Sequence, residues 1–490
     1  MTLTPSATAI LTHFCHIDRK TNPIFVIVLQ TAHYIFPLSR HSGMVFVKTL
    51  HVSPNMNKIK GMNMETATNN LIQVIEIENF YSVRDKVTID FRAENINTAK
   101  ERELKNNIFM WNNKTYLKTI GLFGPNAAGK TNIIFAIRLC CRFILQQLNN
   151  MNAESNIFPT FRFQNYKDKP STFRILFVAE NVEYEYTFSV LHNRVINEEL
   201  HLTSDYNRKN KVFTRTYISE KNTYQYSFAT SLPKDTTFFS KVTAPNQLFL
   251  SQAYTMQQAW TIPVYNFFNL HFLLGIQTAD VALQPDIVDA LKPQLLKMLH
   301  FCDSDIQDIQ VVKQTLMPDT SNLPEQFAKQ LKPAEVRQVF TVHSVDPHIP
   351  FIWGEESKGT QQLITMLLTL IPTLQHNKAL LLDEFDLNMH TRMTHFIFDA
   401  INATKSSQFL FSSHDTTLIS MDLFRRDQIY FVEKDKEQGC TSVSRLIDKK
   451  DFRETMDASK RYIAGHFGAV PNIESAQQAQ YIIRKILYND

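Results

Sequence analysis

The sequence predicts an α/β protein with an antiparallel N-terminal β-subdomain and a mainly helical insertion in its middle. Within residues 71–91, two segments alternate apolar and polar positions, which is the period-2 pattern of paired strands. Two apolar runs, residues 116–124 and Ala379–Leu382, each precede a helical pattern, as buried strands of a parallel sheet do. Residues 256–345 consist mostly of helical patterns joined by polar turns.

The order of these elements divides the 490 residues into five parts, and a chain of this length suggests two to four structural units. We predict two lobes of one α/β domain at 71–255 and 351–475, with the helical insertion at 256–350 between them. A C-terminal helix is expected at 476–490. Residues 1–70 are rich in His, Thr and Asn and lack periodicity, so we expect a disordered leader or an incorrectly assigned start.

The net charge of +4 is concentrated in residues 1–70, which hold six Lys and Arg but two acidic residues. The rest of the chain is therefore close to neutral and has no general electrostatic footprint for nucleic acid, although a local basic groove stays open as an alternative. A competing interpretation of residues 1–70 is a basic arm that binds nucleic acid or a membrane surface.

The cysteines and the apolar segments favour a cytoplasmic chain with no membrane partner. The apolar run Pro23–Phe36 is interrupted by Gln30 and His33, so it is too short and too polar to span a bilayer. No small-residue cleavage site of a signal peptide follows it. Five cysteines show neither a CxxC pair nor metal-ligand spacing, which indicates a reducing compartment: Cys15, Cys140, Cys141, Cys302 and Cys440.

The strongest motif is GPNAAGKT at 124–131, which matches G-x4-G-K-[ST] and lies between a predicted strand and a predicted helix. Two glycines let the backbone turn its N–H groups toward phosphate oxygens, while Lys130 reaches the β and γ phosphates and Thr131 ligates Mg²⁺. The alternative is an ordinary strand–turn–helix. The motif predicts a P-loop that binds ATP with Mg²⁺ through Gly124, Pro125, Asn126, Ala127, Ala128, Gly129, Lys130, Thr131 and Asn132.

A second motif, KALLLDEFD at 378–386, supplies two carboxylates after an apolar strand. An acid at the carboxyl end of a central strand can hold Mg²⁺, and this role is predicted for Asp383. The adjacent Glu384 is predicted to polarise the attacking water, a form of general-base catalysis that contributes about 10²–10⁴ in rate. Together with the P-loop, these carboxylates predict ATP hydrolysis.

Two shorter segments indicate further contacts to the γ-phosphate. In ESKGTQ at 356–361, Ser357 and the N–H groups near Gly359 stand at the start of an apolar helix, although the segment also fits a simple helix N-cap. In FSSHD at 411–415, His414 ends a strand and is predicted to hydrogen bond the γ-phosphate as a catalytic group beside Lys130 and Glu384. A lone histidine at a strand end is otherwise usually structural.

With these motifs in this order, the chain resembles the compact ABC-type ATPases related to the RecF, OLD and SMC heads. More narrowly, it resembles the AAA-type ATP-binding proteins of bacterial abortive-infection and anti-phage operons. The segments that carry the resemblance are 77–91, 121–133, 356–361, 380–390, 411–420, 425–435 and 462–471.

The resemblance implies a P-loop NTPase fold of the ABC-ATPase type and a head-to-tail homodimer that encloses two ATP molecules. It also implies that Ser357, Gly359 and Thr360 are a degenerate signature, that His414 is the switch histidine and that a D-loop starts at Asp386. Gln164 is the candidate for the Q-loop glutamine. The sequence departs from the transporter-type signature at residue 358, where a lysine replaces glycine.

The favoured function is a Mg²⁺-dependent ATPase that drives or gates an effector protein in anti-phage defence. A second hypothesis is a DNA-binding repair or end-processing ATPase of the RecF and SMC kind, and a third is an ATP-bound scaffold that holds a toxin and hydrolyses little. Salt-sensitive binding of DNA would favour the second hypothesis, whereas a stably bound protein would favour the first or third.

Overall fold

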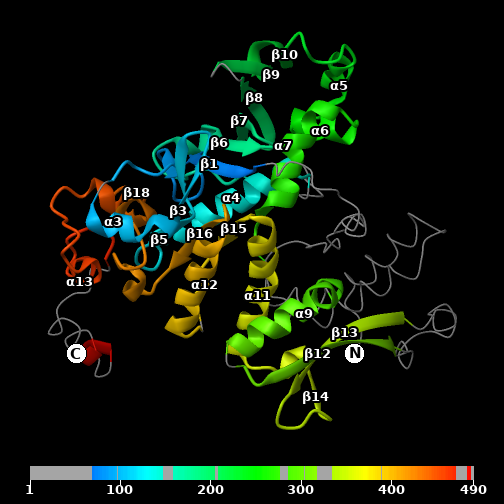
Figure 1. Cartoon of the computed structure of the whole chain (residues 1–490). Coiled ribbons are helices and arrows are strands. Elements are labelled where there is room, and N and C mark those ends of the chain that lie inside the picture. The colour runs from blue at the N-terminus through cyan, green and yellow to red at the C-terminus, as the bar shows by residue number, and fades with distance from the viewer. Residues whose placement is uncertain are drawn as a thin grey trace. The chain divides into compact units, whose positions relative to one another are not determined.

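The computed structural model describes residues 69–96, 98–146, 158–204, 208–275, 285–302, 304–316, 334–387, 389–470 and 483–486 (Figure 1). Two compact units are distinguished, a smaller one within 282–290 and 305–355 and a larger one within 66–281, 291–304 and 356–490. Apart from its last two residues, the expected leader at 1–70 lies outside the described residues. Of the expected C-terminal helix at 476–490, only 483–486 are described, and these are helical.

A seven-stranded antiparallel sheet in the larger unit confirms the predicted N-terminal β-subdomain. In two of its strands, Val87–Asp90 and most of Ser171–Ala179, buried and half-buried residues alternate, as expected for a strand with one face on the core. Two hairpins turn through residue pairs with positive φ, Glu180–Asn181 and His192–Asn193, which is the conformation of the two-residue type I′ turn. In spatial order the strands are β10 (Thr223–Phe228), β9 (Lys209–Ile218), β8 (Arg194–Thr203), β7 (Val182–Leu191), β6 (Ser171–Ala179), β1 (Leu71–Glu78) and β2 (Val87–Asp90).

A six-stranded sheet forms the second layer and carries the predicted motifs. It is parallel except for its last strand, and its central strands are apolar because both faces are covered. In spatial order its strands are β11 (Phe272–Leu273), β15 (Ala379–Leu382), β16 (Gln408–Ser413), β5 (Thr119–Phe123), β17 (Ile429–Lys434) and β18 (Thr441–Arg445).

Helices cover both faces of the parallel sheet. The helix α4 (Lys130–Ile144) lies between the two sheets, and α11 (Lys358–His376) and α12 (Thr391–Ala403) lie on the opposite side (Figure 1). One continuous core joins β1, β6, α4 and β5, so the antiparallel subdomain is packed onto the P-loop helix. Among the described residues, no helix is long and apolar enough to cross a membrane.

The prediction of a mainly helical insertion at 256–350 is wrong for its second half. The first half contains the helix α7 (Ile262–Asn266), a π-helical turn and the helix α9 (Pro285–Phe301). The second half forms a three-stranded antiparallel sheet, because β-branched residues are frequent there and alternate with polar ones. Its strands are β12 (Ile306–Leu316), β13 (Ala334–His343) and β14 (Pro350–Ile352).

The remaining described strands and α-helices are short. They are the hairpin β3 (Ile108–Trp111) and β4 (Lys114–Leu117), and the helices α3 (Ala99–Glu103), α5 (Thr236–Val242), α6 (Phe249–Thr255) and α13 (Ala458–Ile463).

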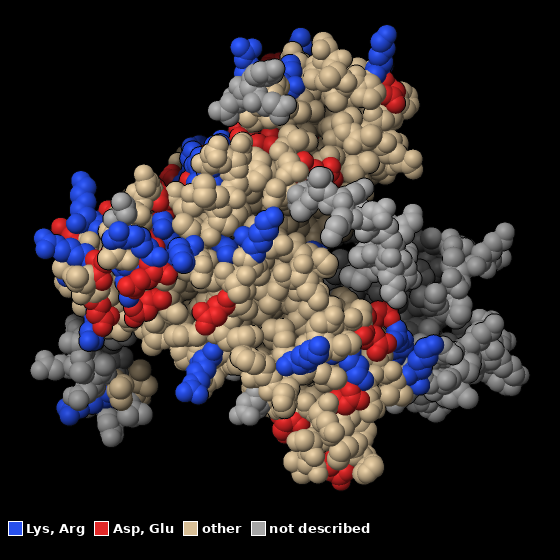
Figure 2. Space-filling model, in the orientation of Figure 1, with Lys and Arg blue, Asp and Glu red and all other residues tan. Residues whose placement is uncertain are grey.

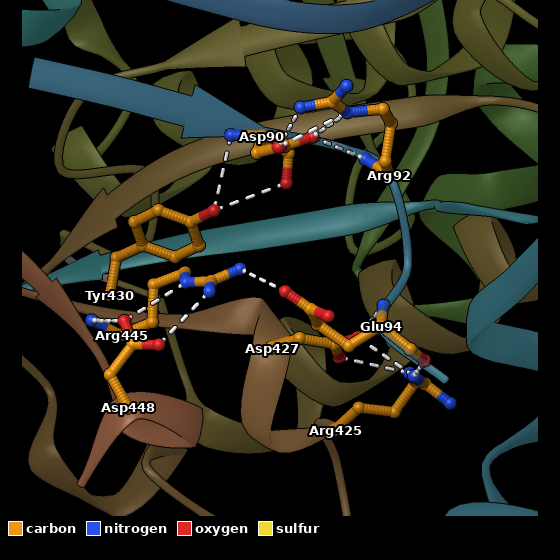
Figure 3. A network of polar contacts seen from close by, with 8 residues as sticks. All are labelled: Asp90, Arg92, Glu94, Arg425, Asp427, Tyr430, Arg445 and Asp448. Carbon is orange, nitrogen blue, oxygen red and sulfur yellow. Dashed lines mark hydrogen bonds and ion pairs between the residues drawn. The ribbon is translucent and has the colours of Figure 1, made fainter. Parts of the chain in front are cut away.

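A network of ion pairs ties the segment after β2 to the last two strands of the parallel sheet (Figure 3). The buried guanidinium of Arg425 pairs with Asp427 at 2.8 Å and with Glu101 at 3.0 Å. Burial raises the pKa of Glu101, while the charge of Arg425 opposes this shift. Arg445 of β18 pairs with Glu94 at 2.9 Å. The network therefore anchors β18, whose first residue contacts the P-loop as described below.

Candidate active site

The loop between β5 and α4 has the backbone geometry of a phosphate-binding loop. Gly124 lies so close to β17 that an added Cβ would be 2.2 Å from the carbonyl oxygen of Val432. Gly129 has φ +110°, a conformation that L side chains rarely adopt. Because α4 begins at Lys130, its unpaired N–H groups and positive dipole end lie at this loop. The other predicted residues occupy the same turn or the start of α4: Pro125, Asn126, Ala127, Ala128, Thr131 and Asn132.

Lys130 is buried at the base of the loop. Its Nζ donates to the carbonyl oxygens of Gly124 at 2.7 Å and Pro125 at 3.1 Å. Burial lowers the pKa of Lys130 to about 8, because the charged form loses hydration. Three nearby carboxylates act against this shift, namely Asp383, Glu384 and Asp386. The ammonium is thus held inside the loop by two of the loop's own carbonyl groups.

The carboxylates after β15 are positioned by the neighbouring strand β16. The Ser412 hydroxyl donates to Asp383 Oδ1 and accepts the backbone N–H of Glu384 at 2.8 Å. Glu384 has φ +46°, an uncommon conformation for a residue with a side chain, which directs the chain sharply away from the strand. One residue further along β16, the hydroxyl of Ser413 donates to Asp386 Oδ2 at 2.6 Å. Burial raises the pKa of Asp386.

His414 lies between the lysine and the glutamate. Its Nδ1 is 3.4 Å from Lys130 Nζ, and its Nε2 is 3.5 Å from Glu384 Oε1. The reason is topological: β16 lies between β5 and β15 in a parallel arrangement, so the three strands end at one edge of the sheet. Three groups far apart in sequence therefore meet where the open α/β sheet is expected to bind its ligand.

Thr131 and Asp383 are the predicted Mg²⁺ ligands, and their setting fits a nucleotide-bound ion. Thr131 is exposed in the first turn of α4, and Asp383 is half-buried at the end of β15. Within the part of the chain that is described, no three His, Cys, Asp or Glu side chains are grouped to hold a metal alone. Mg²⁺ needs no such group, since it keeps water ligands and takes the rest from phosphates and one or two protein oxygens.

The predicted signature lies at the exposed N-terminus of α11. The Ser357 hydroxyl caps the helix by accepting the N–H of Thr360 at 3.1 Å, and the two hydroxyls are 2.9 Å apart. Gly359 is half-buried in the first turn, and Lys358 is exposed. Both contacts join Ser357 to Thr360 within the first turn of the helix. Neither contact links the predicted signature to the cluster of Lys130, Glu384 and His414. A long helix that starts this way can receive an anion at its N-terminus.

Gln164 is also outside the cluster of Lys130, Glu384 and His414. It is exposed in the loop before β6, and its Oε1 accepts a hydrogen bond from Arg84 at 2.7 Å. The loop of Gln164 leads into β6 of the antiparallel sheet. In the parallel sheet, the strand next to β15 is β11, which ends at Leu273. In sequence, the glutamine that follows β11 is Gln277, which lies outside the described residues.

Sequence reasoning missed the polar residues that support these groups. Ser412 and Ser413 lie within FSSHD at 411–415, and their position at the end of the strand that precedes His414 was a signal that could have identified them. Ser82 and Thr441 contact the P-loop from segments hundreds of residues apart, and no local pattern distinguishes them from other serine and threonine residues. Only the pairing of the strands brings them to the loop.

Comparison with known proteins gives one family match. The model of a family described as "AAA domain, putative AbiEii toxin, Type IV TA system" matches residues 120–420. No curated protein matches the chain. Among solved structures, the chain is similar to an SMC head domain from Thermotoga maritima with 10% identity and a TM-score of 0.31, covering 76% of this chain and 98% of that one.

Two further solved structures are similar at the same level. An SMC head bound to the C-winged helix domain of ScpA has 13% identity and a TM-score of 0.35, with 76% of this chain and 97% of that chain covered. A structure of the recombination mediator protein RecF with ATP has 12% identity and a TM-score of 0.37, with 78% of this chain and 100% of that chain covered. At these TM-scores the assignment rests on the family model. That match spans more than half of the chain and includes the P-loop, Asp383, Glu384 and His414, so the chain belongs to this AAA-domain family of P-loop ATPases.

Proposed function

We propose that the chain is a Mg²⁺-dependent ATPase whose nucleotide cycle drives or gates an effector protein in anti-phage defence. The observation that carries the hydrolytic part is the cluster at the sheet edge, in which His414 lies 3.4 Å from Lys130 and 3.5 Å from Glu384. Lys130 would hold the phosphates, Glu384 would accept the proton of the attacking water, and His414 would orient the γ-phosphate. When bound, Mg²⁺ would neutralise phosphate charge beside Thr131 and Asp383.

The defence setting is supported by the family description, which names a toxin of a type IV toxin–antitoxin system. That description pairs a toxin with an antitoxin, so we expect a second protein to act with this chain. The charge distribution gives nucleic acid less support. On the face shown in Figure 2, Lys and Arg lie among Asp and Glu around α3, β18 and α13. Ion pairs such as Arg426–Glu454 and Lys100–Asp422 neutralise several of these cations.

Co-purification would test the role of the partner. We expect the chain purified from its native host to carry a stoichiometric protein that is released or rearranged when ATP is added, and to carry little nucleic acid. Binding of DNA that weakens steeply with salt would instead support the repair hypothesis. A tightly bound protein together with negligible ATP turnover would support the scaffold hypothesis.

The site is proposed to be shared between two copies of the chain, with the first turn of α11 from one copy facing the P-loop of the other. This arrangement accounts for the finding that Ser357 and Thr360 hydrogen bond to each other and not to the P-loop of their own chain. In that arrangement, Lys130→Ala and Gly359→Asp homodimers are both inactive. A mixture that exchanges subunits contains heterodimers in which one site has both defects and the other has neither, so ATPase activity is expected to return.

The matched control carries both substitutions on one chain and is mixed with the wild-type chain. Each heterodimer site then has one defect, so no activity beyond that of wild-type homodimers is expected. Heterodimers are confirmed by pull-down with two tags. If Gly359→Asp is a monomer that hydrolyses ATP normally, the shared site is ruled out.

A further inference from the structure

We propose that Thr441 and Ser82 are positioning residues that orient the peptide between Ala128 and Gly129 and thereby set the affinity of the P-loop for phosphate. The inference rests on the proposed function, because it concerns the same nucleotide site. Neither residue belongs to the P-loop motif, and they reach the loop from the start of β18 and from the turn after β1.

The two hydroxyls form a chain of hydrogen bonds that ends on the loop. Thr441 Oγ1 donates to the carbonyl oxygen of Ala128 at 2.8 Å, and it lies 2.7 Å from Ser82 Oγ. Ser82 Oγ in turn accepts from Asn132 Nδ2 at 2.7 Å. Each hydroxyl has one proton, and the proton of Thr441 is used on Ala128, so Ser82 must donate to Thr441. All donors therefore run in one direction, from Asn132 to the Ala128 carbonyl.

This direction determines where the next N–H points. In a planar trans peptide the C=O and the N–H project to opposite sides. With the Ala128 carbonyl held toward β18, the N–H of Gly129 points away from β18. Backbone N–H groups of a P-loop are the donors that cradle the phosphates. Gly129, at φ +110°, has no side chain to prevent this peptide from rotating, so the Thr441 hydroxyl supplies the restraint that glycine lacks.

The contact is close and buried, which makes it specific. A Cβ added at Gly129 would be 2.1 Å from Thr441 Oγ1 and 2.9 Å from Ser82 Oγ. Thr441 is buried, and a hydrogen bond in such surroundings is less weakened by competing water. The backbone of Thr441 is held separately, because its N–H donates to the Ser82 carbonyl at 2.7 Å and β18 pairs with β17. Removing the hydroxyl therefore leaves the strand in place and frees the peptide.

Four variants test the proposal in the full-length chain. Thr441→Val removes the donor and Thr441→Ser keeps it. Ser82→Ala removes the proton that Thr441 accepts. Thr373→Val is the matched control, since Thr373 is also fully buried and its hydroxyl donates to a carbonyl, that of Thr369 at 2.9 Å, within α11. The Kd values for ATP and ADP with Mg²⁺, kcat at saturating ATP and the Tm without nucleotide are measured for each.

We expect Thr441→Val to raise the Kd for ATP and ADP by the same factor, about tenfold or more, as expected for loss of one well-placed buried donor. The factors are equal because the P-loop amides serve phosphates common to both nucleotides. Thr441→Ser should bind within about twofold of wild type, since its donor is retained. The kcat should change little, because Glu384 and His414 are untouched, and Thr373→Val should alter only the Tm.

The outcomes separate this inference from the proposed function. If the wild-type chain binds neither ATP nor ADP, the proposed function fails and the inference with it. If the wild type binds both nucleotides and Thr441→Val binds them with the same Kd as the wild type, the inference alone is overturned. The inference is also overturned if Thr373→Val raises the Kd as much as Thr441→Val does, since the weaker binding would then follow from a general loss of stability. The Kd of the Ser82→Ala chain for ATP and ADP is expected to lie between the values of the wild type and Thr441→Val. If that Kd equals the wild-type value, Ser82 is not a positioning residue.

Discussion

Glu384→Gln is expected to bind ATP as the wild type does and to hydrolyse it at least about 10²-fold more slowly. The substitution keeps the size of the side chain, and the contact at 3.5 Å to His414 Nε2 can persist with the amide oxygen. The backbone N–H of residue 384 still donates to Ser412 at 2.8 Å, so the turn after β15 is preserved. What is lost is the basic oxygen that accepts a proton from water.

Phosphate release under steady-state conditions and a nucleotide titration measure the two effects separately. Glu103→Gln is the matched control, because Glu103 is exposed on α3 and the chemical change is the same. In the proposed dimer, the Glu384→Gln chain should also accumulate as an ATP-bound dimer, visible by size-exclusion chromatography with ATP present. Turnover at the wild-type rate in this variant would move the catalytic base to another carboxylate, with Asp383 and Asp386 as the next candidates.

Lys130→Ala is expected to raise the Kd for ATP by about 10²-fold or more, since a charge-assisted contact to phosphate is lost inside a partly buried site. The fold should be retained with a lower Tm, because two loop carbonyls lose their donor but no apolar packing is removed. Lys118→Ala is the matched control. Lys118 is also buried and also donates to two carbonyls, those of Asn402 at 2.8 Å and Thr404 at 2.6 Å. Its loss should lower the Tm without changing the Kd.

The same lysine predicts a pH dependence of nucleotide binding. Burial lowers the pKa of Lys130 to about 8 in the nucleotide-free chain, and contact with phosphate oxygens would raise it. Below pH 8 the lysine is already protonated, so binding takes up no proton there. Above pH 8 it must regain a proton to bind, so the Kd rises by up to about tenfold per pH unit. Calorimetry near pH 9 in buffers with different ionisation enthalpies should detect proton uptake by the wild type, and Lys130→Ala should not show it.

Much of the active site could be predicted because its residues lie in short contiguous motifs. A P-loop is defined by local requirements, namely a buried strand, two glycines and a helix start, and all three are visible in 116–132. The carboxylates Asp383 and Glu384 follow an apolar run whose burial is complete in the structure. Alternating residues in β1 and β2 likewise revealed the antiparallel pair, although only β2 alternates buried and half-buried residues in the structure, whereas most of β1 is buried on both faces.

The second half of the insertion shows where local patterns misled us. The segments Ile306–Leu316 and Ala334–His343 contain enough polar residues to resemble amphipathic helices, but they pair with each other as antiparallel strands. Such pairing joins residues distant in sequence, and helix propensity is too weak a preference to resist it. Likewise, no local signal in the sequence reports the hydrogen bond that Gln164 accepts from Arg84, and the Q-loop role of Gln164 stays a prediction.

By itself the sequence determined which residues are candidates to bind phosphate and to activate water, because a glycine-rich loop, a P-loop lysine and strand-end carboxylates are properties of single segments. Only the tertiary structure decided which of them act together. The strand order β15-β16-β5 places His414 between Lys130 and Glu384, although 284 positions separate His414 from Lys130. The pairing of β17 with β18 likewise brings Thr441 to Ala128 across 313 positions. Strand order is fixed by burial and hydrogen bonding between distant segments, and no local window of sequence contains both partners.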